Sequence, residues 1–238
     1  MPAMVFALAT YALFFATFLY AIGFVGSFAV PRCLDGPGTF SLLQALPADT
    51  ALLALFALQH SIMARPWFKR AWTRVVPAHA ERSIYVALSS LALIAIFLGW
   101  RPVPRTLWHL RGPGAAAAWT LFGLGWTVVL LSTFMISHAD LFGLRQALLH
   151  FSMRTYVPPR FQVHWLYKFV RHPIMLGFLV AFWATPSMTV GHLLFATGTT
   201  LYILVALRFE EHDLAAAIGT PYREYREQVP MLLPFLKP

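Results

Sequence analysis

The sequence has few charged residues and no stretch that could form an independent soluble domain. Only 11% of its 238 residues are charged, whereas 59% are hydrophobic. Several apolar runs are about 20 residues long, the length that crosses a hydrocarbon core. No segment between them is long enough, or alternates like strands, to fold separately, and the glycine-rich strand-to-helix fingerprint of a nucleotide-binding sheet is absent. The sequence therefore predicts an integral membrane protein.

Cysteine is nearly absent. Cys33 is the one cysteine in the sequence, so no internal disulfide can form and the cysteine count says little about the compartment. An inert loop thiol is the simpler interpretation of Cys33, and a nucleophile is the alternative.

The apolar runs predict an all-α fold, a polytopic membrane helical bundle. Another apolar block, at residues 173 to 207, is too long for one span and too short for two ordinary ones. Because Pro186 lies near its middle, this block predicts a short helical hairpin. The first run is too long for a signal peptide and lacks a basic start, which favours a retained transmembrane helix. Four full spans are expected, at residues 4 to 30, 42 to 64, 82 to 100 and 115 to 137.

Basic residues are unevenly distributed along the chain. Fourteen of the 18 Lys and Arg residues fall in segments 65 to 82, 139 to 172 and 208 to 238. Because cytoplasmic loops are enriched in Lys and Arg, both termini and these segments are predicted to be cytoplasmic. The net charge of +9 then needs no nucleic-acid partner, since such loops meet anionic lipid head groups. We expect one domain, with the spans in residues 1 to 138 and the cytoplasmic segment, hairpin and tail in residues 139 to 238.

Cationic and acidic side chains are predicted to meet where the hairpin begins and ends. Proline is unstrained in the first turn of a helix, so Pro173 places Arg171 and His172 just before a helix N-terminus, where an anion is favoured. Three of the nine acidic residues follow the other arm, namely Glu210, Glu211 and Asp213. Paired ionisable groups at a membrane interface indicate a functional site, with a structural ion-pair network as the alternative. A ligand with both an ammonium and a carboxylate group, such as an amino acid or a sulfonium that carries one, suits these charges.

Two motifs carry a family resemblance. "RHPIMLG" and "EEHDLAAAIGTPYREYREQVPMLLP" resemble the C-terminal signature of the isoprenylcysteine carboxyl methyltransferase family of integral membrane methyltransferases, over residues 165 to 238. Within that superfamily the whole chain is most similar to the bacterial methanethiol S-methyltransferases, through "HSIMARPWFKR", "SHADLFGLRQ" and "FWATPSMTVGHLLFA". The resemblance implies S-adenosylmethionine as co-substrate without a metal, a small thiol as acceptor, and a bacterial inner membrane with no implied protein partner.

The resemblance also implies where the co-substrate binds. Arg171 and His172 match the family's R-H-P and would hold the carboxylate end or close the pocket. Glu210 and Glu211 would take the amino group or the ribose hydroxyls. Tyr222 and Tyr225 could cover the adenine or anchor the interface. Gly177 matches the glycine that permits close packing. The full set of expected binding residues is His164, Arg171, His172, Gly177, Arg208, Glu210, Glu211, Tyr222 and Tyr225.

The chain departs from the family pattern at two positions. Met175 replaces the usual aromatic residue and Ile218 replaces the phenylalanine before glycine. Met175 lies near the expected co-substrate, which weakens the case for a prenylated peptide as the acceptor.

A small thiol must lose its proton before it attacks a methyl group. Its pKa lies above the value of about 8.5 for cysteine, so the enzyme should provide a base or a cationic environment. The candidates lie where two spans end on the cytoplasmic side, and they are His60, His138, Asp140, Arg145 and Gln146. Asp140 could orient either His138 or His60, as in catalytic triads. The alternative is that each histidine simply stabilises a helix C-terminus.

Other interpretations remain open from the sequence. Nine histidines could supply haem ligands, although most lie near helix ends or in loops. A transporter would explain intramembrane charges, but the spans lack a polar stripe. For a methyltransferase, the alternative acceptor is lipophilic, such as a prenylated cysteine carboxylate or a phospholipid amine.

Overall fold

The computed structural model describes residues 1 to 38 and 40 to 236, and they are mostly helical. Lys237, which contributed to the count of basic residues, lies outside the described residues. The described chain forms two compact units. Of the described residues, unit 1 comprises 1 to 38, 40 to 105, 138 to 158 and 190 to 192, and unit 2 comprises 106 to 137, 159 to 189 and 193 to 236.

Five helices of the described chain are long and apolar enough to cross a membrane. They are α1 (Pro2–Gly26), α2 (Leu42–Ala64), α4 (Ala78–Gly99), α5 (Gly112–Ile136) and α9 (Val190–Ile218). The polytopic helical architecture is therefore confirmed, but the count of four full spans was wrong. The error arose at α9, whose 29 residues continue through the acidic cluster instead of ending before it.

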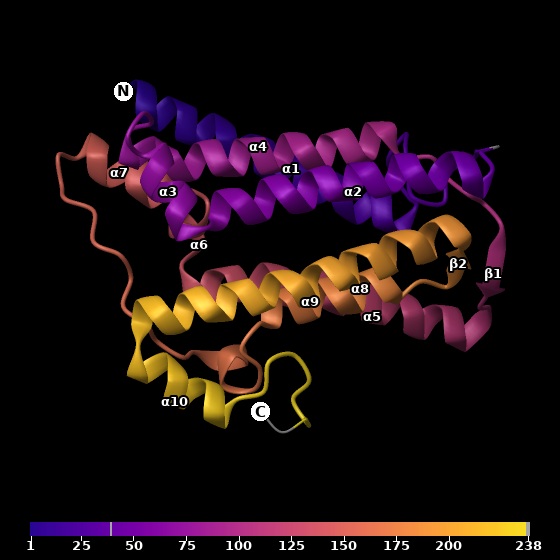
Figure 1. The fold of residues 1–238 in the computed structure, drawn as a ribbon. Coiled ribbons are helices and arrows are strands. Elements are labelled where there is room, and N and C mark those ends of the chain that lie inside the picture. The colour runs from indigo at the N-terminus through magenta and orange to yellow at the C-terminus, as the bar shows by residue number, and fades with distance from the viewer. Residues whose placement is uncertain (39, 237–238) are drawn as a thin grey trace. The chain divides into compact units, whose positions relative to one another are not determined.

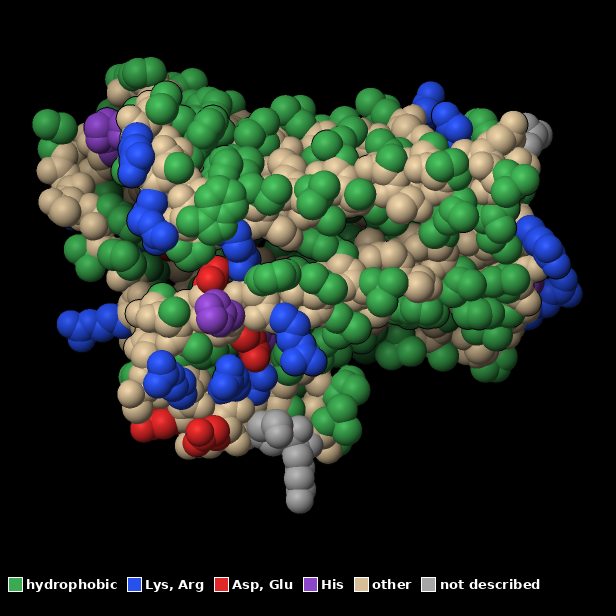
Figure 2. Space-filling view, in the orientation of Figure 1, with side chains coloured by type: hydrophobic (Ala, Val, Ile, Leu, Met, Phe, Trp, Pro, Cys, Tyr) green, Lys and Arg blue, Asp and Glu red, His purple; other side chains and the backbone are tan. Residues whose placement is uncertain are grey.

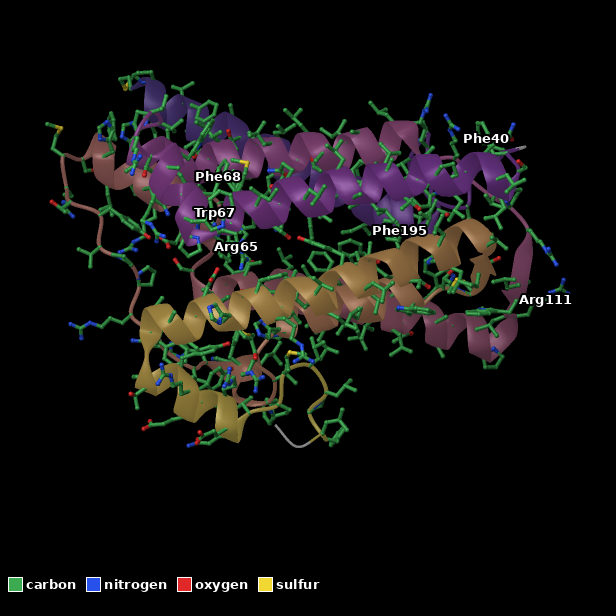
Figure 3. All side chains as sticks on the ribbon, viewed as in Figure 1. Phe40, Arg65, Trp67, Phe68, Arg111 and Phe195 are labelled. Carbon is green, nitrogen blue, oxygen red and sulfur yellow. The ribbon has the colours of Figure 1, made fainter. Side chains whose placement is uncertain are left out.

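Unit 1 is built around α4, which packs against both α1 and α2 (Figure 1). The short helix α3 (Pro66–Trp72) follows α2 directly, with Trp67 and Phe68 just beyond the corner at Arg65 (Figure 3). Near this corner Met63, Tyr85 and Val86 form a buried cluster that packs against Phe68 among others. Helices α6 (His138–Leu141) and α7 (Leu144–Phe151) complete the unit, with α7 against α1 and α4.

The ends of the first and third spans differ from their predicted positions. The chain turns at Ser27 and Ala29, which both have positive φ, and Leu34 N–H bonds back to the Phe24 carbonyl, so α1 ends at Gly26 instead of residue 30. Helix α4 begins at Ala78, so Arg82 lies inside a helix and not in the preceding loop.

Unit 2 consists of α5, α8 (Pro173–Trp183), the larger part of α9, the short helix η1 (Trp165–Lys168) and α10 (Thr220–Gln228). Helices α5 and α8 pack so closely that a Cβ added to Gly177 would lie 2.7 Å from the Gly125 carbonyl oxygen. Charged side chains gather over α10 and the adjacent end of α9, whereas hydrophobic side chains cover the long helices (Figure 2).

A small antiparallel sheet joins β1 (Thr106–His109) to β2 (Ser187–Thr189). Thr106 pairs with Thr189, Trp108 with Met188 and His109 with Ser187. The all-α prediction missed these strands because each is only 3 or 4 residues long.

The predicted helical hairpin exists, but its two arms are unequal. Helix α8 has 11 residues and ends at Trp183, three residues before Pro186, whereas α9 has 29 residues. Strand β2 lies between them and its pairing with β1 supplies partners for backbone groups that a helix would have satisfied internally.

Candidate functional site

The start of α8 carries a buried ion-pair cluster in unit 2. The Arg171 Nε donates to Glu211 Oε1 at 2.6 Å and Nη2 donates to Oε2 at 3.0 Å, a bidentate pair. His172 Nε2 lies 3.1 Å from the same Oε1. All three residues are buried. The structure thus brings together the cations and the carboxylate that the hairpin was expected to join, and we call these three residues the Arg171 cluster.

Arg171 also ties the C-terminal segment to α8. Its Nη1 donates to the backbone carbonyls of Arg226 and Val229, so four of the five guanidinium N–H donors have protein acceptors. The backbone N–H groups of Arg171 and His172 donate to the carbonyls of Pro230 and Met231. Arg171 therefore holds three segments together, and Glu211 balances its charge.

Tyr222 and Tyr225 belong to a buried aromatic cluster beside these charges. They pack with Val229, and the ring of Phe161 meets each of them edge-on, at 5.8 and 5.5 Å. Burial raises the pKa of Tyr225 to about 12 and raises the pKa of Tyr222 further, in spite of the nearby Arg171 guanidinium, so both hydroxyls are neutral donors at pH 7.

The two tyrosine hydroxyls differ in their partners. The Tyr225 hydroxyl donates to the Tyr167 carbonyl at 2.6 Å. The Tyr222 hydroxyl is buried and has no hydrogen-bond partner in the part of the chain that the structure describes. Because a buried donor without an acceptor is costly, this hydroxyl points to a polar ligand. The charges of Glu211, Arg171 and Glu210 all act on it.

The other predicted binding residues lie in different surroundings. Arg208 and His164 are exposed, and His164 Nε2 lies 2.8 Å from the Gln162 amide oxygen. Gly177 lies at the contact between α8 and α5, where its lack of a side chain permits the close packing. Met175 packs against the apolar cluster of Ile203, Leu207 and Leu232.

Sequence reasoning missed Tyr167. Its side chain is largely shielded, its hydroxyl lies 3.5 Å from the Ser132 carbonyl, and burial raises its pKa, with a smaller contribution from Glu210. Its position four residues before Arg171, close to the R-H-P motif, was an available signal.

In unit 1, His60 is held by two hydroxyl groups. Its Nδ1 lies 3.1 Å from Ser89 Oγ and its Nε2 lies 2.9 Å from the Tyr85 hydroxyl. The His60 ring also stacks on Phe56, at 5.1 Å between ring centroids. We call His60, Tyr85 and Ser89 the His60 network. Because Tyr85 and Ser89 lie one turn apart on α4, sequence spacing alone did not connect them with α2.

Asp140 binds other partners than histidine. Its Oδ1 accepts from Arg145 Nη1 at 3.2 Å and its Oδ2 accepts from the Tyr156 hydroxyl at 3.0 Å. The Gln146 amide donates to the Asp140 backbone carbonyl at 3.2 Å. Neither of the two His–Asp pairs considered from the sequence forms among the described residues, and the carboxylate binds Arg145 and Tyr156 instead.

His138 follows the end of α5, as expected, and contacts α1. Its Nε2 lies 2.9 Å from the Tyr11 hydroxyl, and its ring meets the Phe142 ring at 4.8 Å. Burial lowers the pKa of His138, so its imidazole is neutral at pH 7 and can accept a hydrogen bond from the Tyr11 hydroxyl.

Comparison with known proteins shows which family the chain belongs to. The chain is 55% identical over 232 residues to the methanethiol S-methyltransferase of Mycobacterium tuberculosis, an alignment that covers 97% of this chain and 95% of that protein. The chain belongs to the methanethiol S-methyltransferase family. The resemblance seen in the sequence motifs is thereby confirmed.

More distant similarity extends beyond the methanethiol S-methyltransferase family. Methanethiol S-methyltransferase 2 of Bradyrhizobium diazoefficiens is 51% identical, covering 98% of this chain and 90% of that protein. A Nurim homologue of Drosophila pseudoobscura is 30% identical, covering 84% of this chain and 88% of that protein. No family profile matches the chain. No solved structure matches it either.

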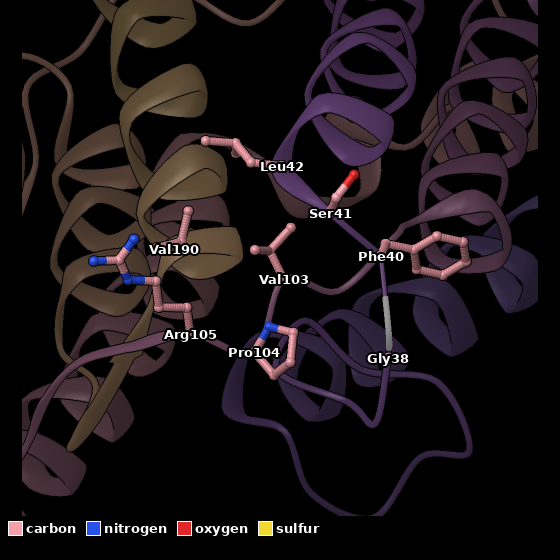
Figure 4. Close-up of a pocket in the computed structure, with 8 residues that line it drawn as sticks. All are labelled: Gly38, Phe40, Ser41, Leu42, Val103, Pro104, Arg105 and Val190. Carbon is pink, nitrogen blue, oxygen red and sulfur yellow. The ribbon is translucent and has the colours of Figure 1, made fainter.

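One pocket of this methanethiol S-methyltransferase family member lies in unit 1, near the start of α2. It has a volume of about 390 Å³, and Phe40, Val103 and Arg105 line it with five other residues (Figure 4). None of the predicted site residues lines it, and its position at the N-terminal end of α2 separates it from His60 at the other end. Among the described residues, no group of three or more His, Cys, Asp or Glu side chains could hold a metal ion.

Proposed function

We propose that the protein transfers a methyl group from S-adenosylmethionine to methanethiol and so forms dimethyl sulfide. The identity of 55% with a methanethiol S-methyltransferase over 97% of the chain carries this proposal. The five apolar helices agree with a small, membrane-soluble acceptor. We further propose that the protein lies in the bacterial inner membrane with both termini in the cytoplasm, as the distribution of basic residues predicts.

The residues of unit 2 fit the methyl donor. The amino acid end of S-adenosylmethionine carries an ammonium and a carboxylate. Glu211 is a buried acceptor, and the neighbouring His172 is a buried hydrogen-bonding group. The unpartnered Tyr222 hydroxyl could donate to the donor's carboxylate or a ribose oxygen. Four of the Arg171 donors already have protein acceptors, so Arg171 serves mainly to hold Glu211 in place. When bound, S-adenosylmethionine supplies an electrophilic methyl group on a sulfonium.

The His60 network is the proposed base. If Nδ1–H donates to Ser89 Oγ, then Nε2 is free of a proton and accepts from the Tyr85 hydroxyl. Tyr85 can then pass its own proton to Nε2 while it receives the proton of the thiol. His138, Asp140, Arg145 and Gln146 would position the segment between α5 and α7, because Asp140 joins α6 to Arg145 and Tyr156.

Headspace gas chromatography with mass detection tests the function. Detergent-purified protein receives methanethiol and S-adenosylmethionine with a deuterated methyl group. Dimethyl sulfide with one labelled methyl group is expected, and a His172→Ala variant should form little of it. The exposed Arg74→Ala variant serves as a matched control for surface substitution. Absence of the labelled product, with the donor still bound, would contradict methanethiol as the acceptor.

A further inference from the structure

Arg82 of α4 is a guanidinium group with unused hydrogen-bond donors. Its Nε donates to the Leu141 carbonyl at 2.8 Å. In the described part of the chain its two terminal nitrogens have no hydrogen-bond partner, and no carboxylate lies within ion-pair distance. By contrast, Arg145 is paired with Asp140 and Arg171 is paired with Glu211. Arg82 is also only partly exposed, so its charge is less screened than that of a surface arginine.

Arg82 lies beside the proposed base. Its guanidinium carbon is 5.2 Å from the centroid of the Tyr85 ring, and the Tyr85 hydroxyl is the partner of His60 Nε2. Tyr85 therefore has a positive group over its ring and a proton acceptor at its hydroxyl.

The surroundings of Arg82 combine apolar groups with a second unused donor. Tyr85 is buried with Met63 and Val86, and the partly buried Phe142 packs against them. Ser83 is 1% exposed, and its hydroxyl has no hydrogen-bond partner among the described residues. Both Arg82 and Ser83 lie against the turn at residues 141 to 143. Arg82 donates to the Leu141 carbonyl, and a Cβ added to Gly143 would lie 2.5 Å from Ser83 Oγ. Thioether and aromatic groups suit a soft sulfur atom, and unused donors suit an anion.

The geometry points to Arg82 as the group that binds and stabilises the thiolate of the acceptor, an assignment that rests on the proposed function. In the step, the S–H bond of methanethiol breaks and its proton passes through the Tyr85 hydroxyl to His60 Nε2. The sulfur electron pair forms the new S–C bond, and the pair of the broken C–S bond stays on the sulfur of the donor. The positive charge of the sulfonium thus ends on His60, and the Arg82 guanidinium stabilises the transient thiolate.

Other titratable groups lie on this end of α4 or on elements packed against it. They are His79, Glu81 and Tyr85 on α4, His60 on α2, Tyr11 on α1, Arg65, Lys69 and Arg70 at α3, and His138, Asp140, Arg145 and His150 on α6 and α7. A pH profile must therefore be read as a difference between wild type and variant.

The test measures kcat/KM for methanethiol against pH, at saturating donor, in wild type, Arg82→Gln and Arg82→Lys. Removal of the charge should lower kcat/KM about 100-fold at pH 7, a typical cost of losing one donor to a reacting anion. The loss should shrink as the pH rises, because hydroxide then ionises the thiol in solution. Arg82→Lys keeps the charge and should recover much of the activity. With a more acidic acceptor, 2,2,2-trifluoroethanethiol, the Arg82→Gln substitution should lower kcat/KM less than it does with methanethiol.

Two further measurements separate this role from folding and from the overall function. The donor affinity and thermal unfolding temperature of Arg82→Gln should match those of Arg74→Gln, an exposed control. The ultraviolet absorbance of bound thiolate, recorded without donor, should be present in wild type and lost in Arg82→Gln. The role of Arg82 would be overturned if Arg82→Gln lowered kcat/KM by the same factor at every pH and for both thiols. Equal thiolate absorbance in wild type and Arg82→Gln would overturn it as well. Wild type that binds thiolate but forms no dimethyl sulfide contradicts the proposed function and leaves Arg82 as the thiolate site.

Discussion

At the scale of single residues, the buried charges of unit 2 balance one another. Arg171 and Glu211 form a bidentate pair shielded from water, and His172 shares the same carboxylate oxygen. Breaking a buried pair by removing one partner leaves an uncompensated charge, whereas replacing both partners with apolar groups can be nearly neutral. The Arg171 cluster therefore contributes to stability and, under the proposed function, to donor binding, so variants must separate the two effects.

Glu211→Leu should destabilise the protein by about 3–5 kcal/mol because it leaves Arg171 buried without its carboxylate. The double variant Arg171→Met, Glu211→Leu should recover only part of that loss, because the carbonyls of Arg226 and Val229 then lose their donor. Neither variant should bind S-adenosylmethionine if Glu211 takes its amino group. Unfolding in detergent gives the stability and calorimetry gives the affinity. A single variant as stable as wild type would show that the ion pair carries little weight in the fold.

Tyr222 and Tyr225 offer a matched comparison because only one of their hydroxyls has a protein partner. Tyr225→Phe removes the bond to the Tyr167 carbonyl and should cost about 1 kcal/mol of stability with little effect on donor affinity. Tyr222→Phe removes a buried donor that has no partner in the described chain, so it should leave stability equal or higher and weaken donor binding. Thermal unfolding and donor titration of both variants check this. Unchanged donor affinity in Tyr222→Phe would remove its hydroxyl from the binding site.

At the scale of elements, α5 and α8 are in backbone contact through two glycines. A Cβ added to Gly125 would lie 2.7 Å from the Ala181 nitrogen and 2.8 Å from the Gly177 carbonyl oxygen. Since α8 begins directly after Arg171 and His172, the separation of the two helices also sets where these side chains lie. The packing of α8 against α5 thus helps to set the geometry of the candidate donor site.

Gly123 and Gly125 test this contact within one helix. Gly125→Ala should destabilise the protein by about 1–3 kcal/mol through overpacking and weaken donor binding. Gly123→Ala adds a Cβ with nothing within 4 Å, so the better helix propensity of alanine should leave the stability unchanged or raise it by up to about 1 kcal/mol. Thermal unfolding of both variants compares them directly. Equal destabilisation by the two substitutions would mean that helix propensity, not contact with α8, decides the outcome.

Local sequence signals predicted some elements well and others poorly. Long apolar runs and Pro173 placed the helices, because length, hydropathy and proline position act locally. The hairpin predicted from Pro186 placed Arg171 and His172 near Glu211, because a hairpin returns the chain to the end where it began. The partners of His60 and Asp140 could not be predicted, since Tyr85, Ser89 and Tyr156 meet them only through tertiary packing. The extent of α9 was missed because polar residues in its last turns look like the end of a span.

At the scale of the whole molecule, the number of membrane passes follows from the hairpin in unit 2. Helix α8 has 11 residues, and the chain continues from it through residues 184 to 186 into strand β2, whereas α5 has 25 residues. The pairing of β2 with β1 places the end of this arm beside the start of α5. We therefore infer that the α8 arm is itself a full pass, which makes six passes with the five long helices. An even number places both termini on one face, in agreement with the distribution of basic residues.

Cysteine labelling of intact cells and of inverted vesicles tests this topology in a Cys33→Ser background. Single cysteines at Ser152, before α8, and at Thr220, after α9, should react with a membrane-impermeant maleimide only in inverted vesicles. Cysteines at Ser41, before α2, and at Ser187, between α8 and α9, should react in intact cells. Labelling at Ser187 only in inverted vesicles would contradict the six-pass arrangement.

The reciprocal contact of Gly125 and Gly177 has a consequence for the divergence of related sequences. Each glycine leaves room for the carbonyl group of the other, so a larger residue at either position meets backbone that cannot rotate away. Substitutions at the two positions should therefore be correlated. Both residues should stay small among relatives that keep the Arg171 cluster, and a relative with a larger residue at one position should also differ at the other. Two residues that are 52 positions apart and carry no functional group would then mark, by covariation alone, which distant members still hold the methyl donor in the same place.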